Sequence, residues 1–198
     1  MHSYNKMGNE NNSNENRRMV TIDLVKANQF AVGILVGTTL VMLFAFFMIW
    51  PKAFNLATFK DLLSPMKVLL FVVAMMVGIV VHELIHGITF ACFAPSGWKS
   101  ISFGVIWKML TPYCHCDEPV SLRHYQKAAL MPCVVLGIVP TMVAMFISSL
   151  WLLALGVFFI AAAAGDLWMA WLLTKEDPRC KVLDHPSEAG YYLYPPEE

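Results

Sequence analysis

Apolar residues gather in long, nearly uninterrupted runs along this chain. The first run extends from Phe30 to Trp50 and the second from Val68 to Ala94, each long enough to cross a hydrocarbon core that needs about 20 helical residues. A third run begins at Ala128, and a helix of its length would far exceed a core about 30 Å thick, so we expect a turn at Ser148-Ser149. The pattern therefore predicts four transmembrane helices, near 29–50, 67–94, 127–148 and 151–173.

The segment between the second and third runs has a different pattern. Apolar and small or polar residues alternate from Ile101 to Trp107, which indicates a short strand, and Thr111-Pro112 interrupts the alternation. We therefore expect an all-α membrane protein with about four transmembrane helices and a short β-hairpin or re-entrant segment between helices two and three. Its predicted divisions are a disordered polar N-terminal tail (1–27), a membrane-embedded domain (28–175) and a polar C-terminal tail (176–198).

Composition supports this class of protein. Hydrophobic residues make up 58% of the 198 residues and charged residues 14%, against about 45–50% and 25% in soluble domains. The expected environment is therefore a lipid bilayer, and the formal net charge of zero gives no sign of a nucleic-acid partner.

The distribution of lysine and arginine predicts the orientation in that bilayer. With four spans, the N-terminus, the central loop and the C-terminus share one side and carry most of these residues. The opposite side has only Lys52, Lys60 and Lys67. Because basic residues accumulate on the cytoplasmic side, we expect a multi-pass protein of the bacterial cytoplasmic membrane with its N-terminus in the cytoplasm.

The second run contains the motif His82-Glu83-Leu84-Ile85-His86. Histidines four residues apart lie on one helical face and can bind Zn²⁺ together. Glu83 can act as general base on a zinc-bound water. Ionisable side chains are costly inside a membrane, which favours a functional site over a chance match.

A catalytic zinc usually has three protein ligands, and Asp166 is the other acid within a predicted span. Counted from the cytoplasmic ends of their helices, His86 and Asp166 lie at a similar depth. The small residues 161–165 are expected to let this helix approach the motif helix closely. His115 is an alternative third ligand or a group lying over the site, and the adjacent Cys114 and Cys116 lack the spacing of a structural zinc site.

These motifs resemble the "putative zincin peptidase" family of short bacterial membrane proteins, and more broadly the site-2 proteases, which are intramembrane metallopeptidases. The matching segments are His82 to Gly87, Phe103-Gly104, Thr111 to Cys116, Pro132, Gly165-Asp166 and Asp184-His185-Pro186. The resemblance implies zinc ligation by His82, His86 and Asp166, with Glu83 as the catalytic residue. Asp166 departs from typical site-2 proteases, because the Asn-Pro that belongs to their motif is missing before it.

The expected function is that of a zinc-dependent membrane-embedded endopeptidase acting on a membrane protein or peptide in or near the bilayer. A possible role of the strand at 101–107 is to hold an unwound substrate by strand addition. The alternative is a zinc-binding membrane protein without proteolytic activity: a transporter, a sensor or a pseudoenzyme. The intact Glu83 argues against a pseudoenzyme, because zinc ligation alone does not require it.

Overall fold

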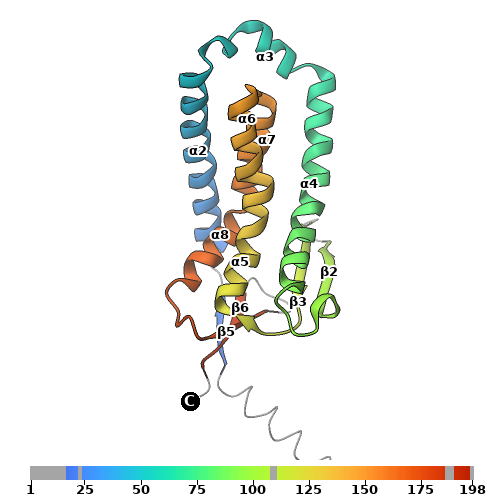
Figure 1. Ribbon diagram of the computed structural model, residues 1–198, viewed down its shortest axis with the longest axis vertical. Helices are drawn as coiled ribbons and strands as arrows, with labels where there is room; N and C mark the ends of the chain where they lie inside the picture. The colour runs from blue at the N-terminus through green and yellow to red at the C-terminus, as the bar shows by residue number, and fades with distance from the viewer. Residues whose placement is uncertain (1–16, 22–23, 108–110, 186–189, 197–198) are drawn as a thin grey trace, which may run out of the picture.

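Long apolar helices stand side by side in the computed structural model, with small β-sheets at one end (Figure 1). The structure describes residues 17–21, 24–107, 111–185 and 190–196. Two of the long helices are α2 (Leu24–Ile49) and α4 (Pro65–Ala91). A further long helical stretch is made of α5 (Leu122–Pro132), a π-helical turn (Cys133–Ile138) and α6 (Val139–Ile147), which follow one another without a break. They are followed by α7 (Leu150–Ala162) and α8 (Ala164–Leu173).

Three of these helical stretches are long and apolar enough to cross a membrane: Val25–Ile49, Pro65–Ala91 and Leu122–Ile147. Helices α7 and α8 form a fourth span if they are counted together, with a bend of 46° between them. The expectation of a mostly helical membrane protein is confirmed. The third span begins five residues before the expected 127, and Pro132 lies inside it, where the π-helical turn accommodates the missing amide.

The connections follow local capping rules. A short helix α3 (Leu56–Leu62) lies within the expected connector between α2 and α4, and the Asn55 side chain caps it by accepting a hydrogen bond from Thr58 N at 3.0 Å. The turn predicted at Ser148-Ser149 is present. Ser148 has a left-handed backbone with φ 57°, and Ser149 caps α7.

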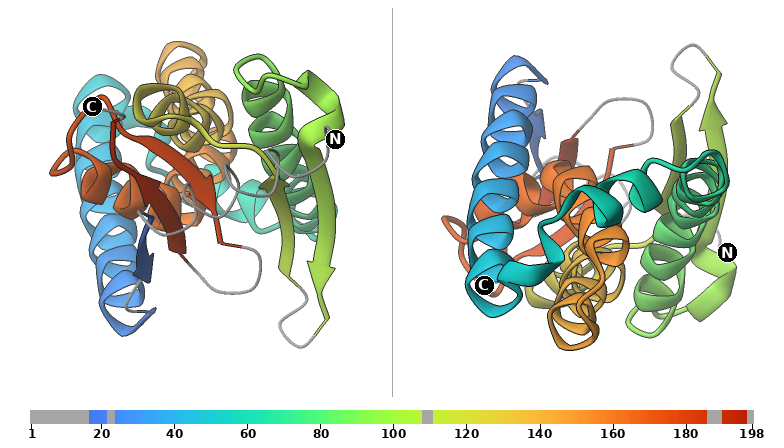
Figure 2. Two further views of the ribbon diagram at one scale, coloured as in Figure 1. Left: turned by 90° about the horizontal axis from the view of Figure 1, so that it is seen from below. Right: turned by 90° about the horizontal axis from the view of Figure 1, so that it is seen from above.

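The strand pattern at 101–107 corresponds to a β-hairpin. Strands β2 (Ile101–Ile106) and β3 (Thr111–Cys116) pair antiparallel, with Ile101 opposite Cys116, and β3 packs against α4 (Figures 1 and 2). Pro112 is the second residue of β3 and does not end the strand pattern. It is tolerated there because a two-stranded sheet has edges at which a missing amide costs no pairing.

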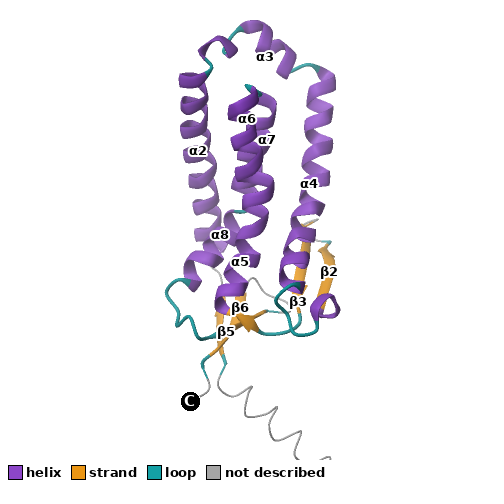
Figure 3. Ribbon diagram, in the orientation of Figure 1, coloured by secondary structure: helices purple, strands orange, loops and turns teal. Residues whose placement is uncertain are grey.

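A second sheet joins the two ends of the described chain. Its strands are β1 (Arg18–Thr21), β4 (Val120–Ser121), β5 (Lys181–Asp184) and β6 (Gly190–Tyr194), in the order β1-β6-β5-β4. Figure 3 shows β5 and β6 below the helices. Val182 and Tyr191 are completely buried in a core with residues of α4, α5 and α8. Strands thus lie in both segments that were expected to be polar tails. The two to four apolar residues of each strand give too little periodicity to detect.

Glycines set the closest helix contacts. A Cβ on Gly156 of α7 would lie 2.8 Å from Thr141 N and 2.9 Å from Gly137 O. One on Gly78 of α4 would lie 2.0 Å from Cζ of the buried Phe159. Close approach was also expected at residues 161–165. Ala163 and Ala164 are buried there, whereas a Cβ on Gly165 would meet nothing within 4 Å.

Candidate metal centre

The two motif histidines are buried on one face of α4, in the half of the helix nearest the sheets. His82 is 8% exposed and His86 7%, and their imidazole rings lie edge to face with centroids 4.8 Å apart. The helical repeat brings both Nε2 atoms to the same point, 3.2 Å from each other.

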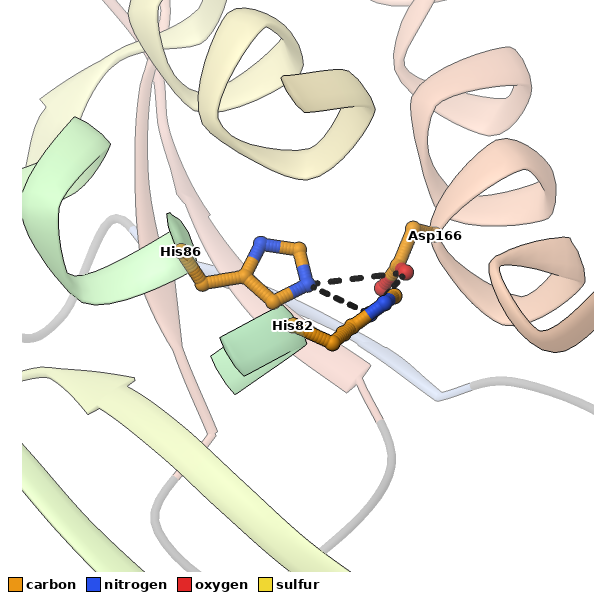
Figure 4. A group of neighbouring side chains, drawn as sticks. All are labelled: His82, His86 and Asp166. Atoms are coloured by element: carbon orange, nitrogen blue, oxygen red, sulfur yellow. Dashed lines mark hydrogen bonds and ion pairs between the residues drawn. The ribbon is translucent and has the colours of Figure 1, made fainter. Parts of the chain in front are cut away.

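Asp166 reaches this point from the other side (Figure 4). Its Oδ2 lies 3.1 Å from His82 Nε2 and 3.5 Å from His86 Nε2. The bend between α7 and α8 places Asp166 in the first turn of α8, so that its carboxylate is directed toward α4. Among the described residues, these three form the one group of at least three histidine, cysteine and acidic side chains that could hold a metal ion.

The hydrogen bond on the far side of His86 fixes which atom faces the group. His86 Nδ1 lies 2.9 Å from the Ala128 carbonyl oxygen, which can only accept, so Nδ1 carries the proton. In the neutral imidazole, Nε2 then presents a lone pair toward the Asp166 carboxylate. Such a backbone partner is the usual support of a metal-binding histidine.

The spacing of the three atoms fits zinc. Ligand atoms about 2.0–2.1 Å from a tetrahedral ion lie about 3.3 Å from one another. The observed separations of 3.1, 3.2 and 3.5 Å are close to this value. Two nitrogens and one carboxylate oxygen also leave a fourth position for water or substrate, as catalytic zinc sites do.

Glu83 stands beside the histidines but takes part in a different contact. Its half-buried carboxylate accepts a hydrogen bond from the Cys114 backbone amide of β3. Gly87, one turn further along α4, allows the hairpin to come this close, because a Cβ there would lie 2.4 Å from Phe103 Cζ. The hairpin therefore borders the Glu83 side of the site.

His115 belongs to a separate polar cluster. Its Nε2 lies 3.2 Å from Asp117 Oδ1, and its Nδ1 lies 3.8 Å from Asp184 Oδ2. The structure thus brings Asp166, and not His115, to the histidine pair. Cys114 and Cys116 form no disulfide, and burial raises the pKa of both thiols, as expected for unreactive groups.

Asp184 is a residue whose importance sequence reasoning missed. Its carboxylate accepts hydrogen bonds from the Tyr125 hydroxyl of α5 and, at 3.0 Å, from the Cys116 amide of β3. Burial raises the pKa of this carboxyl group. Asp184 thereby joins the helix that supports His86 to the strand that contacts Glu83. Asp184 belongs to the Asp184-His185-Pro186 segment, which is one of those that resemble the family. Nothing in the sequence of that segment indicated that the Asp184 side chain is buried.

Comparison with known proteins supports a metallopeptidase. The model of the family described as "Putative zincin peptidase" matches residues 75–181, a segment that contains both histidines, Glu83 and Asp166. No curated protein and no solved structure matches the chain. Because the family model covers more than half of the sequence, the chain belongs to the zincin peptidase family and, at that level, to the zinc metallopeptidases.

Proposed function

We propose that this protein is a zinc-dependent, membrane-embedded endopeptidase of the site-2-protease type. In this proposal His82, His86 and Asp166 hold the ion, and Glu83 is the general base. The observation that carries the proposal is the convergence of two buried histidine nitrogens and a half-buried carboxylate oxygen, at zinc-compatible separations, between two segments that could span a membrane.

The chemistry divides between the ion and the chain. A bound zinc would act as a Lewis acid and lower the pKa of its water ligand to about 7. Glu83 accepts a proton from the attacking water and delivers it to the leaving amine. The Cys114 amide holds the Glu83 carboxylate in place, and the Ala128 carbonyl holds the ring of His86.

The position of the site suggests where cleavage occurs. Both ligand-bearing helices reach it near the end of the molecule that carries the sheets, and on the charge distribution that end is cytoplasmic (Figure 1). A substrate helix must unwind before hydrolysis, because helical amides are hydrogen-bonded and shielded. The hairpin beside Glu83 offers strand edges that could bind the extended segment of a membrane protein or peptide.

The test compares zinc content with peptidase activity in the purified full-length protein. Glu83→Gln should keep the zinc of the wild type, measured by elemental analysis, and should lose cleavage of a fluorescence-quenched transmembrane peptide library in detergent. Glu118→Gln makes the same chemical change on a carboxylate that contacts Ser96 outside the site, and should keep both properties. Full cleavage by Glu83→Gln would contradict the mechanism. Zinc transport in proteoliposomes by a wild type that cleaves nothing would replace it with the transporter alternative.

A further inference from the structure

A groove of about 470 Å³ lies between α5 and α8, and none of the three candidate metal ligands lines it. Its volume is within the range of about 300–1,000 Å³ that is common for ligand clefts. Gln126 and Ala170 line it and join the two helices, because Gln126 Nε2 donates a hydrogen bond to the Ala170 carbonyl oxygen at 3.1 Å.

The lining changes from basic to apolar along the helices. Arg123 and Lys127 lie in the first two turns of α5, and Trp171 lies near the end of α8. Leu130 is seven residues beyond Arg123, which places it about 10 Å deeper at 1.5 Å per residue. The groove is therefore cationic toward the end of the span and aliphatic deeper in it.

The cations at the mouth are available for an anion. Arg123 and Lys127 form no ion pair within the part of the chain that the structure describes, although Lys127 also lies over the Phe93 ring at 5.8 Å. The two acidic residues that follow α8 form ion pairs with other cations, Glu176 with Arg18 and Asp177 with Arg179.

We propose that this groove binds an anionic phospholipid. The headgroup phosphate lies between Arg123 and Lys127, and one acyl chain runs inward along Leu130 and Leu167. The match is one of charge and of depth, because a bilayer lipid has its anion and its hydrocarbon in this same order. The proposal concerns lipid binding and is independent of peptidase activity.

Native mass spectrometry of the detergent-purified, full-length protein can test it with two lipids of identical acyl chains. Basic residues near the membrane surface attract anionic headgroups. Two such residues should favour dioleoylphosphatidylglycerol over dioleoylphosphatidylcholine by about thirtyfold in affinity. The double variant Arg123→Gln/Lys127→Gln should lose this preference. The control Lys52→Gln/Lys60→Gln, at the opposite end of the spans, should retain it.

Equal affinity of the wild type for the two lipids would overturn the proposal, whatever the variants do. Equal loss of preference in the control double variant would also overturn it, because the effect would then reflect overall charge. Displacement of the lipid by millimolar inorganic phosphate would show a site for free anions instead.

Discussion

The contact between α6 and α7 allows a sharp test of how the helix packing supports the metal centre. In Gly156→Ala the new Cβ would lie 2.4 Å from Thr141 Oγ1, 2.8 Å from Thr141 N and 2.9 Å from Gly137 O. Two of these three atoms belong to the backbone, so no side-chain rotation can relieve the clash. The helices themselves must move apart.

The expected size follows from these distances. Non-bonded atoms prefer separations of about 3.5 Å, so the helices must separate by roughly 0.5–1 Å. Overpacking costs about 1–3 kcal/mol, and a clash with backbone atoms, which no rotamer change relieves, belongs in the upper part of that range, at about 2–3 kcal/mol. Replacing a helical glycine by alanine returns about 1 kcal/mol. At about 2–4 °C per kcal/mol for a chain of this length, a net loss near 1–2 kcal/mol lowers the Tm by roughly 2–8 °C.

The same helix displacement should also change the geometry of the metal centre. Helix α7 leads directly into α8 through Ala163, so a displaced α7 moves Asp166 relative to His82. Zinc ligands tolerate deviations of only about 0.2 Å, and we expect zinc affinity to fall by about 10–100-fold.

The assay is thermal unfolding of detergent-purified protein together with a zinc titration. Gly37→Ala is the matched control, because Gly37 is also helical and a Cβ there would meet nothing within 4 Å. Its Tm should stay the same or rise. A Gly156→Ala protein with the Tm and zinc affinity of the wild type would refute the packing argument.

Three further predictions concern other parts of the fold. Asp166→Ala should lose most of its bound zinc while His115→Ala keeps about one equivalent, and the reverse pattern in elemental analysis would make His115 the ligand. Burial raises the pKa of Asp184 above the value of about 3.9 in an unfolded chain, so the native state binds this proton more tightly than the unfolded state does. The free energy of unfolding should therefore fall as the pH rises from about 4 through the raised pKa. Asp184→Asn should flatten this part of the curve of Tm against pH, and identical curves would contradict the assignment. Ser148→Gly should raise the Tm by about 2–4 °C, because it relieves roughly 1 kcal/mol of left-handed strain at φ 57°, and an unchanged Tm would show that the turn is unstrained.

Features with a strong local signal could be predicted from the sequence. Apolar runs of 20 or more residues predict membrane helices because the bilayer imposes that length, and the turn at Ser148-Ser149 followed from the same constraint. The histidine pair was predictable because its geometry depends on a single helix. Asp166 was inferred as the other acid within a predicted span, at a depth similar to that of His86, and in the structure its carboxylate lies within 3.5 Å of both histidine rings.

Features that depend on contacts distant in sequence were not predictable. The four-stranded sheet joins β1 to β6, more than 160 residues apart, and each strand is too short for a periodic signal. The role of Asp184 depends on burial between α5 and β3, which composition does not reveal. The close contacts at Gly137 and Gly156 likewise depend on which helices become neighbours, and single glycines in apolar runs do not specify that.

The bend between α7 and α8 has a consequence for hydration. The first amides of a helix have no partner within that helix, and Gly165 in the first turn of α8 is exposed with open space around it. Hydrocarbon cannot accept hydrogen bonds from such amides, whereas water can. The start of α8 is therefore a place where the backbone favours water over lipid. In the proposed mechanism, the break that directs Asp166 toward the histidines would also favour water, the second reactant of hydrolysis, beside the metal centre.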